Sequence, residues 1–283
     1  MFNASDSNFH DLYNLFMKSF PGFLSIRDED HRLVYLNETF KNWIKKYTNV
    51  DVIGLTNEEI AKDLDSNVAD VFQECHDLTI SFLYDSDTNN KIIKFIEEGN
   101  TLYFDVMKFK CEYQGKAYIF TQGKDITTLY NETKNYEIQA VTDELTGLHN
   151  RKIFNRLDFK ESDLFIYVDL NNFKIINDKF GHLVGDQILV KFSNLLRESF
   201  RKNQDHIIRL GGDEFLIIVD MYENEFNFDE EVKRVRAKFN QVFSDYADLG
   251  FSYGYHQYSI NLEHTLNLVD KLMYQDKEKK RTM

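Results

Sequence analysis

Apolar residues in the first 127 positions recur at two spacings, that of one face of a helix and that of a strand. A helix is predicted before Pro21, with Ser7 as its cap and an apolar stripe formed by Phe9, Leu12, Leu15 and Phe16. Strands are predicted over residues 23–26, 33–36, 91–96, 101–110 and 117–122, and helices over residues 39–47, 57–64 and 67–82. This order indicates a sheet of antiparallel type with short helices.

A connecting helix is predicted over residues 128–141, which contain no helix breaker. Leu129, Ile138 and Val141 would form an apolar seam on this helix. The seam fits a helix that pairs with a second copy, and it fits equally a helix that lies on its own domain. A segment of this length does not decide between them, because a coiled coil is recognised from several heptads.

The second half of the chain alternates strands and helices. Strands are predicted over residues 164–168, 206–210, 215–219 and 251–255, and helices over residues 150–159, 173–180, 186–200, 229–243 and 264–275. Gly211 and Gly212 separate two apolar strands, which is typical of a hairpin. The pattern predicts an α/β domain of the ferredoxin-like kind, an arrangement also found in nucleotidyl cyclases and polymerase palms. The fold class expected for the chain is α+β with two domains.

Composition and charge argue against some classes of partner. The chain has 283 residues, enough for about two domains, and a net charge of −13, which opposes a protein that coats nucleic acid. The longest apolar runs are the length of a strand, so no membrane span is expected. The N-terminus lacks the pattern of a secretion signal, and Cys75 and Cys111 have no metal-ligand spacing. A cytoplasmic protein is therefore expected.

Acidic residues at two places along the chain are the candidates for catalysis. Asp169 follows an apolar strand, and Asp213 and Glu214 follow the paired glycines between two further strands. Carboxylates on neighbouring strands can share Mg²⁺, an ion that prefers oxygen ligands and can serve phosphoryl transfer. Taken alone, the glycines also fit a plain hairpin with solvated acids beside it.

Three motifs together resemble the GGDEF family of diguanylate cyclases. They are residues 143–151 (DELTGLHNR), residues 169–186 (DLNNFKIINDKFGHLVGD) and residues 209–215 (RLGGDEF). The resemblance covers residues 143–283. The first 127 residues resemble a PAS sensor domain, which often ends in Asp-Ile-Thr as residues 125–127 do here. The predicted domains are thus residues 1–127 (PAS-like sensor), 128–142 (connecting helix) and 143–283 (cyclase).

The GGDEF resemblance implies a reaction. Two subunits face each other as a homodimer, each binds one GTP, and two GTP condense into cyclic di-GMP with release of two pyrophosphates. Two Mg²⁺ ions per active site, with Mn²⁺ as a possible substitute, would be held by the side chains of Asp169 and Asp213 and the carbonyl of Leu170. Asp213 would also draw the proton from the 3′-hydroxyl, with Glu214 assisting, and Lys174 would offset charge on the phosphates.

The same resemblance assigns the substrate-binding residues. Asn177 and Asp186 would read guanine, whose donor edge adenine lacks. His182 would either contact the substrate or orient its loop. The remaining assigned positions are Asn172 and Phe173 in the second motif and Lys277 and Arg281 at the terminal phosphates.

Three features depart from the family. Lys202 stands where the family often carries the arginine of a product-inhibition site, so feedback inhibition is doubtful. Asp276 and Lys280 replace residues that are usually alanine and glycine. A catalytically silent domain that binds GTP or cyclic di-GMP, and a cyclase making a mixed guanine–adenine product, are the alternatives. Retention of the acids opposes the first of these, and Asp186 opposes the second.

The sequence names no ligand for the first domain. His76 could be nominated as a haem ligand, but a lone histidine is more often an ordinary helix residue. Phe40, Trp43 and Tyr47 fit packing better than a flavin site. The sensed signal, its sign and the resting oligomeric state stay open.

Overall fold

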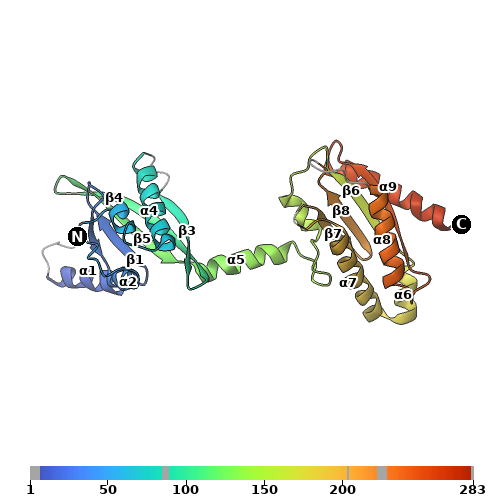
Figure 1. The fold of residues 1–283 in the computed structure, drawn as a ribbon, viewed down its shortest axis with the longest axis horizontal. Helices are drawn as coiled ribbons and strands as arrows, with labels where there is room; N and C mark the ends of the chain where they lie inside the picture. Colours follow the sequence, from blue (N-terminus) through green and yellow to red (C-terminus); the bar gives the residue numbers. More distant parts are fainter. Residues whose placement is uncertain (1–6, 85–88, 203, 222–227, 282–283) are drawn as a thin grey trace. The chain divides into compact units, whose positions relative to one another are not determined.

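The computed structural model describes residues 7–84, 89–202, 204–221 and 228–281. The chain separates into two compact units, Met1–Lys134 and Asn135–Met283 (Figure 1). The point of separation lies within helix α5 (Thr127–Ala140). None of the helices in the described ranges is both long and apolar enough to cross a membrane.

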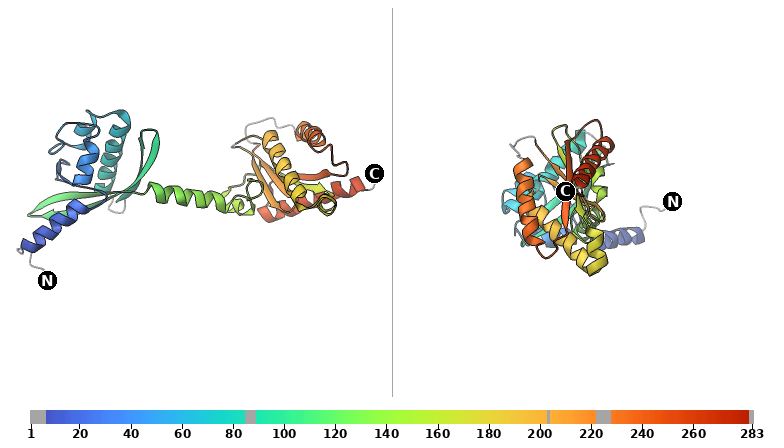
Figure 2. Two further views of the ribbon diagram at one scale, coloured as in Figure 1. Left: turned by 90° about the horizontal axis from the view of Figure 1, so that it is seen from below. Right: turned by 90° about the vertical axis from the view of Figure 1, so that its right-hand side faces the viewer.

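The first unit is built on a five-stranded antiparallel sheet in the order β2-β1-β5-β4-β3. Its elements are α1 (Ser7–Ser19), β1 (Phe23–Arg27), β2 (Leu33–Leu36), α2 (Glu38–Ile44), α3 (Asn57–Ala61), α4 (Ser66–Tyr84), β3 (Asn90–Glu97), β4 (Asn100–Tyr113) and β5 (Lys116–Asp125). Helices α2, α3 and α4 cover one face of this sheet (Figure 2). The antiparallel sheet expected from the sequence is confirmed.

Aromatic side chains fill the space between this sheet face and the helices. Phe23 on β1 stacks on Phe40 at 5.1 Å and on Phe104 at 5.2 Å between ring centroids. Trp43 on α2 packs among the same rings and is buried. The interpretation of Phe40 and Trp43 as packing residues is therefore confirmed, and Tyr47 packs against the same cluster.

Helix α1 forms as predicted, but its apolar stripe does not join the core. Leu12, Leu15 and Phe16 are all more than half exposed, whereas Met17 is buried. The side chain of Phe9 lies outside the described residues. Helical spacing thus identified the element but not the face that it buries.

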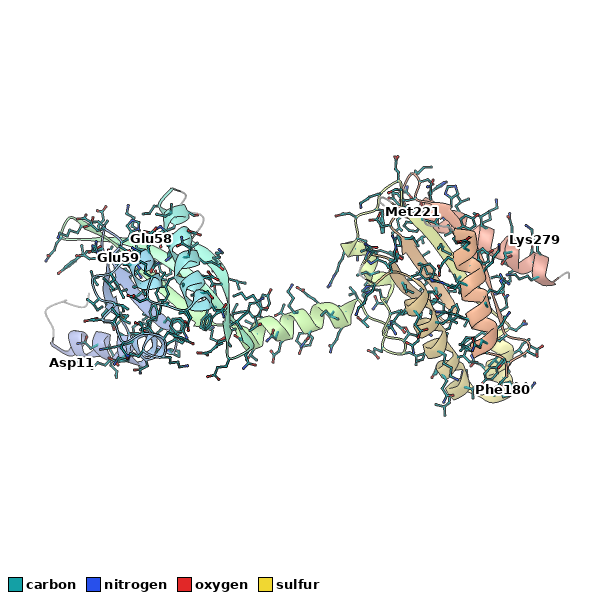
Figure 3. The ribbon with its side chains drawn as sticks, viewed as in Figure 1. Asp11, Glu58, Glu59, Phe180, Met221 and Lys279 are labelled. Atoms are coloured by element: carbon teal, nitrogen blue, oxygen red, sulfur yellow. The ribbon has the colours of Figure 1, made fainter. Side chains whose placement is uncertain are left out.

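Helix α3 is short, and its start is fixed by a capping box. Thr56 Oγ1 accepts a hydrogen bond from Glu59 N at 3.2 Å, and Glu59 Oε2 accepts one from Thr56 N at 3.0 Å. Glu59, labelled in Figure 3, also receives a hydrogen bond from Arg32 at 2.9 Å. The cap holds the buried Asn57 at the first position of the helix.

The second unit has a four-stranded antiparallel sheet in the order β7-β8-β6-β9. Its elements are η1, a 3₁₀ helix (Arg151–Arg156), β6 (Leu164–Asn171), α6 (Phe173–Phe180), α7 (His182–Ser199), β7 (His206–Gly211), β8 (Glu214–Val219), α8 (Phe228–Val242), β9 (Gly250–Gln257) and α9 (Leu262–Arg281). From β6 onward the succession is β-α-β-β-α-β with two added α-helices, one beside the first helix of this core and α9 after the last strand, as expected for the ferredoxin-like arrangement.

Each face of the second sheet carries its own core. Ile166, Val168 and Leu170 of β6 pack with α7 and α8, whereas Phe165 and Tyr167 pack with α9 and η1. Neighbouring residues of a strand point to opposite faces. Asp169 therefore shares the α9 face with Phe165 and Tyr167, and this parity decides which side chains can reach it.

Three local predictions differ from the structure. The helix predicted over residues 150–159 is the shorter η1, because Leu157 is extended and packs with Phe154 and Phe159 against the second core. Helix α7 begins at His182 rather than Asp186, since Gly181 at φ 85° turns the chain directly from α6 into α7. Strand β6 runs on to Asn171, so Asp169 lies within the strand.

Candidate active site

The paired glycines form the turn between β7 and β8. Gly211 and Gly212 have φ values of 149° and 53°, which residues other than glycine rarely adopt. Arg209 fixes the turn from one side, because its Nε and Nη2 donate to the carbonyl of Gly212 at 3.0 and 2.8 Å. The Nη1 of the same guanidinium donates to both carboxylate oxygens of Asp143, at 3.1 and 3.2 Å. The first and third sequence motifs are thus joined through one arginine.

Asp143 is held in its ionised form by these partners. It accepts hydrogen bonds from the backbone N of Thr146 at 2.9 Å and from its hydroxyl at 2.6 Å. Burial alone would raise the pKa of Asp143, but the hydrogen bonds from Thr146 and Arg209 together lower it below its ordinary value. The motif around Asp143 therefore supports the glycine turn structurally.

Three acidic residues lie on adjoining backbone segments where β6 passes the glycine turn. Asp169 on β6 lies directly opposite Glu214 on β8 in the antiparallel register. The backbone N of Leu170 donates to the carbonyl of Asp213 at 3.2 Å, which ties the strand to the turn itself. Opposed carboxylates destabilise a sheet unless cations offset them.

Two basic side chains supply this offset. The ammonium of Lys277 on α9 forms a hydrogen-bonded ion pair with Asp169. A guanidinium nitrogen of Arg151 lies 3.9 Å from a carboxylate oxygen of Glu214. Both basic residues come from the elements that cover the α9 face of the sheet, the face to which Asp169 and Glu214 point.

The position of these acids affects their electrostatics. Burial, and then the negative charge of Asp169, raise the pKa of Asp213, while Lys277 and Arg209 act in the opposite direction. Burial, followed by the charge of Glu214, raises the pKa of the Tyr167 phenol. The carboxylates therefore interact through a partly desolvated space.

The donor set fits Mg²⁺. Within the described ranges, no three acidic, histidine or cysteine side chains converge into a closed metal cage. Mg²⁺ is commonly held by one or two carboxylates, with substrate phosphates and water completing the octahedron. Asp169 and Asp213 provide two carboxylates. The ammonium of Lys277 pairs with Asp169, the carboxylate to which a metal ion would bind.

A second group of predicted site residues surrounds Gly185. A Cβ added at this position would lie 1.9 Å from the side-chain oxygen of Asn177 and 3.2 Å from the ring of Phe173. The Oδ1 atom of Asn177 is buried, and it has no hydrogen-bond partner within the described part of the chain. Asp186, the next residue along α7, is exposed. Glycine at 185 thus allows α6 and α7 to pack closely, with Asn177 against Gly185, the residue before Asp186.

The other predicted site residues lie around these two groups. Asn172 adopts φ 61° at the start of α6 and donates from Nδ2 to the carbonyl of Asp248 at 2.8 Å. The side chain of Phe173 is buried in the core, whereas Lys174 and His182 are exposed. Arg281 ends α9, and its side chain lies outside the described residues.

Several contacts were not predicted from the sequence. The Nδ2 of Asn171 donates to Ser252 Oγ at 3.0 Å, and its buried Oδ1 lacks a partner within the described part of the chain. Asp276 and Lys280, the two departures on α9, form an ion pair with each other. Asp276 accepts from the backbone N of Tyr253 at 3.2 Å. The i,i+4 spacing of these opposite charges was the available signal.

Known proteins resemble this unit. Residues 140–283, just over half of the chain, match the family described as "Diguanylate cyclase, GGDEF domain". The diguanylate cyclase DgcS of Shewanella oneidensis is 43% identical over 91 residues, which cover 29% of this chain and 30% of that protein. DgcN of Escherichia coli, also a diguanylate cyclase, is 29% identical over 188 residues, covering 55% of this chain and 44% of that protein.

A relative named as a phosphodiesterase matches as well. The cyclic di-GMP phosphodiesterase PdeR of Escherichia coli is 36% identical over 131 residues, covering 43% of this chain and 20% of that protein. The chain thus spans less than half the length of each of these three relatives. Together with the joined motifs and the acidic cluster at the glycine turn, the match over residues 140–283 means that this chain belongs to the GGDEF diguanylate cyclase family.

Proposed function

We propose that the second unit condenses two GTP molecules into cyclic di-GMP and releases two pyrophosphates. The observation that carries this proposal is the placement of Asp169 opposite Glu214 in the strand register, with the backbone of Leu170 hydrogen-bonded to that of Asp213. Each 3′-hydroxyl attacks the α-phosphate of the other GTP. Two phosphodiester bonds form, two bonds to pyrophosphate break, and each hydroxyl gives up one proton.

The acids and the nearby cations divide the work. Asp169, Asp213 and the carbonyl of Leu170 would hold two Mg²⁺ ions, or Mn²⁺, which supply Lewis-acid stabilisation of the phosphate oxygens. The Asp213 carboxylate accepts the proton of the 3′-hydroxyl, with Glu214 beside it. Lys277, freed from Asp169, holds the terminal phosphates together with Arg281, and Lys174 offsets negative charge during transfer.

The group around Gly185 selects the base. The carboxylate of Asp186 accepts hydrogen bonds from N1–H and the amino group of guanine, and Asn177 contributes its unpaired oxygen. His182, at the first position of α7, lies close enough in sequence to join them. Asn172 and Phe173 form the start of α6, the helix that carries Asn177.

A homodimer completes the reaction, since each active site holds one of the two nucleotides. The first unit acts as a PAS-like sensor, an assignment supported by its strand order and by the Asp-Ile-Thr ending at residues 125–127. Residues 1–127, 128–142 and 143–283 then serve as sensor, connecting helix and cyclase. The need for GTP and Mg²⁺ favours a cytoplasmic site of action.

A silent GGDEF domain that binds GTP or cyclic di-GMP is the alternative. The ion pair between Lys277 and Asp169 favours it, because the ammonium occupies a carboxylate that the metal would need. Retention of all three acids favours the cyclase.

Incubation of the purified chain with Mg²⁺ and GTP, with and without ATP, decides between these functions. Chromatography of the products should show cyclic di-GMP from GTP alone. Added ATP should leave the identity of the product unchanged. Binding of GTP without any cyclic dinucleotide would establish the silent regulator. A mixed product formed only when ATP is present would contradict the assigned role of Asp186.

A further inference from the structure

The first unit contains an internal cavity of about 60 Å³ between the helix-covered face of its sheet and helices α2, α3 and α4. Its lining is mainly aromatic and aliphatic, with residues such as Phe23, Trp43, Phe72 and Ile93. Two of its lining residues are nevertheless basic, Arg27 on β1 and Lys108 on β4. Basic side chains are rarely placed in an apolar interior without a negatively charged partner.

Both cations are deeply buried. Lys108 is 1% exposed and Arg27 is 4% exposed. Lys108 lies directly opposite Thr121 on β5, which in turn lies opposite Ser25 on β1. Arg27 follows two residues after Ser25 and thus shares its face of the sheet. The polar groups form one continuous row across three strands at the floor of the cavity.

The partners of the two cations are neutral. The ammonium of Lys108 donates to Thr121 Oγ1 at 3.1 Å. Arg27 donates from Nη1 to the carbonyls of His31 at 2.9 Å and Leu55 at 3.2 Å, and from Nη2 to the side-chain oxygen of Asn57. These contacts orient both groups but cancel neither charge.

No described residue that lines the cavity carries a carboxylate. Asp28, the chain neighbour of Arg27, acts on the guanidinium through space but does not line the cavity, so the remaining candidate for a counter-charge within the lining is the thiol of Cys75. Burial raises the pKa of this thiol in spite of the nearby cations, so it stays neutral at physiological pH. The described part of the cavity therefore holds two positive charges and no negative one.

We propose that this cavity binds a small organic anion, a monocarboxylate with a short apolar body, whose carboxylate lies between Lys108 and Arg27. A carboxylate accepts several hydrogen bonds in one plane, which suits the unused donors of an ammonium and a guanidinium. The aromatic and aliphatic lining receives the apolar body. A fully charged inorganic anion would leave that lining without a partner.

The volume limits the size of the ligand. A buried water needs roughly 10–15 Å³ of such space, so the cavity takes a ligand of only a few heavy atoms. Short-chain carboxylates such as acetate, propionate and butyrate are of this size. Because the cavity lies wholly in the first unit, the inference does not depend on cyclase activity.

The test uses the full chain without GTP. Trp43 is the single tryptophan of the protein and lines the cavity, so its fluorescence reports on this unit alone. Acetate, propionate and butyrate are titrated by calorimetry and by fluorescence-detected melting. Propionamide and butyramide serve as uncharged matches, and chloride and phosphate as inorganic anions. We expect at least one carboxylate to bind and raise the melting temperature, and the amides and inorganic anions to do neither.

Variants then locate the site. Lys108→Met should weaken carboxylate binding by about tenfold or more, the factor that corresponds to losing about 1.4 kcal/mol of interaction. Lys110→Met, on the same strand but exposed, should bind as the unchanged protein does. Lys108→Gln gives a polar replacement should the methionine variant fold poorly. Absence of carboxylate binding, equal binding of the amides, or undiminished binding by both Lys108 variants would overturn the proposal.

Discussion

Lys277 and Asp169 are 108 positions apart in sequence, yet they form an ion pair on the α9 face of the second sheet. The strand parity that turns Asp169 toward α9 makes this contact possible. The ammonium thus competes with any metal ion for one of the two proposed carboxylate ligands. Occupation of the site by metal and triphosphate requires Lys277 to move from the carboxylate to the phosphates.

Replacing Lys277 with methionine should therefore have two opposite effects. Mg²⁺ alone should stabilise Lys277→Met more than the unchanged protein, because the competing cation is gone. The KM for GTP should rise by about tenfold or more, since one phosphate contact is lost. Melting followed by circular dichroism with and without Mg²⁺, beside steady-state kinetics, measures both.

The neighbouring Lys279→Met, on the same helix, is the matched control and should change neither quantity. An unchanged response to Mg²⁺ in Lys277→Met would show that the ion pair does not compete with metal.

Asp213→Ala should abolish cyclic di-GMP formation and leave the fold intact. The side chain lies in the glycine turn, and the hydrogen bond from Leu170 goes to the backbone of Asp213, which the substitution retains. Turnover should fall by roughly a thousandfold, in the range seen when one group of a catalytic cluster is removed. Glu263→Gln, in the first turn of α9, removes a distant carboxylate as control. Retained turnover in Asp213→Ala would refute its assigned role.

Gly185→Ala tests the packing beside the base-reading group. Helix propensity alone predicts a gain of about 1 kcal/mol for this change. We expect instead a loss of roughly 1–3 kcal/mol, because the new Cβ would lie 1.9 Å from Asn177 Oδ1. Gly250→Ala, whose Cβ would meet ordinary contacts from 3.6 Å outward, should change stability little.

Urea unfolding of the Gly185 variant is followed by far-ultraviolet circular dichroism. The fluorescence transition of Trp43 provides an internal reference, since it lies in the other unit and should not shift. Stabilisation of Gly185→Ala would contradict the close approach of Asn177.

The stability of the first unit should rise with pH because of Lys108. Burial brings the pKa of Lys108 from 10.5 down to about 8, although the charge of Cys75 opposes this shift, and the charge of Arg27 adds a smaller lowering effect. Between these two values the unfolded chain binds a proton that the folded chain has lost, so raising the pH favours the folded state. The full effect is on the order of 3 kcal/mol, at about 1.4 kcal/mol per tenfold change in proton affinity.

The comparison with Lys108→Met isolates this contribution. Arg27 and Cys75 titrate in both proteins, so their effects largely cancel in the difference. We expect the methionine variant to be the more stable at pH 7 and its advantage to shrink by pH 9.5, measured by urea unfolding with Trp43 fluorescence. A constant difference across this range would show that Lys108 titrates normally.

Product inhibition should be weak. Asp205 is the acid of the altered inhibitory segment, and Arg201 binds its carboxylate with Nε at 3.1 Å and Nη2 at 2.6 Å. Cyclic di-GMP would meet a lysine at position 202 and an acid that is already paired. Added product should slow the enzyme little, and Lys202→Arg should restore inhibition only slightly. Strong inhibition of either protein at low product concentration would contradict this.

Much of the architecture follows from local patterns. The apolar run over residues 164–168 and the paired glycines predicted the strands and the turn that join Asp169 to Asp213, because both signals depend on neighbouring residues. The partner of Asp169 did not follow, since it depends on which face α9 covers. The end of β6 was also missed, because Asp169 and Asn171 are polar but remain hydrogen-bonded in the strand.

The cavity of the first unit shows the same limit. Arg27 follows the strand predicted over residues 23–26, Lys108 lies within the strand predicted over residues 101–110, and the sequence analysis assigned neither of them a role. Their burial results from the pairing of β1, β5 and β4, which brings Arg27 and Lys108, 81 positions apart in sequence, onto one face of the sheet. A basic residue at an inward position of a strand is recognisable only when the register of its neighbours is known.

Strand β5 carries Thr121 in the cavity and ends at Asp125, whose carboxylate accepts a hydrogen bond from Thr127 N at 2.8 Å at the start of α5. The hydroxyl of Thr127 in turn accepts one from Tyr103 N on β4, the strand of Lys108. An extended strand spans about 3.3 Å per residue and resists compression along its length. A sideways or lengthwise shift of Thr121 would consequently displace the first turn of α5, about 20 Å away at this rise per residue.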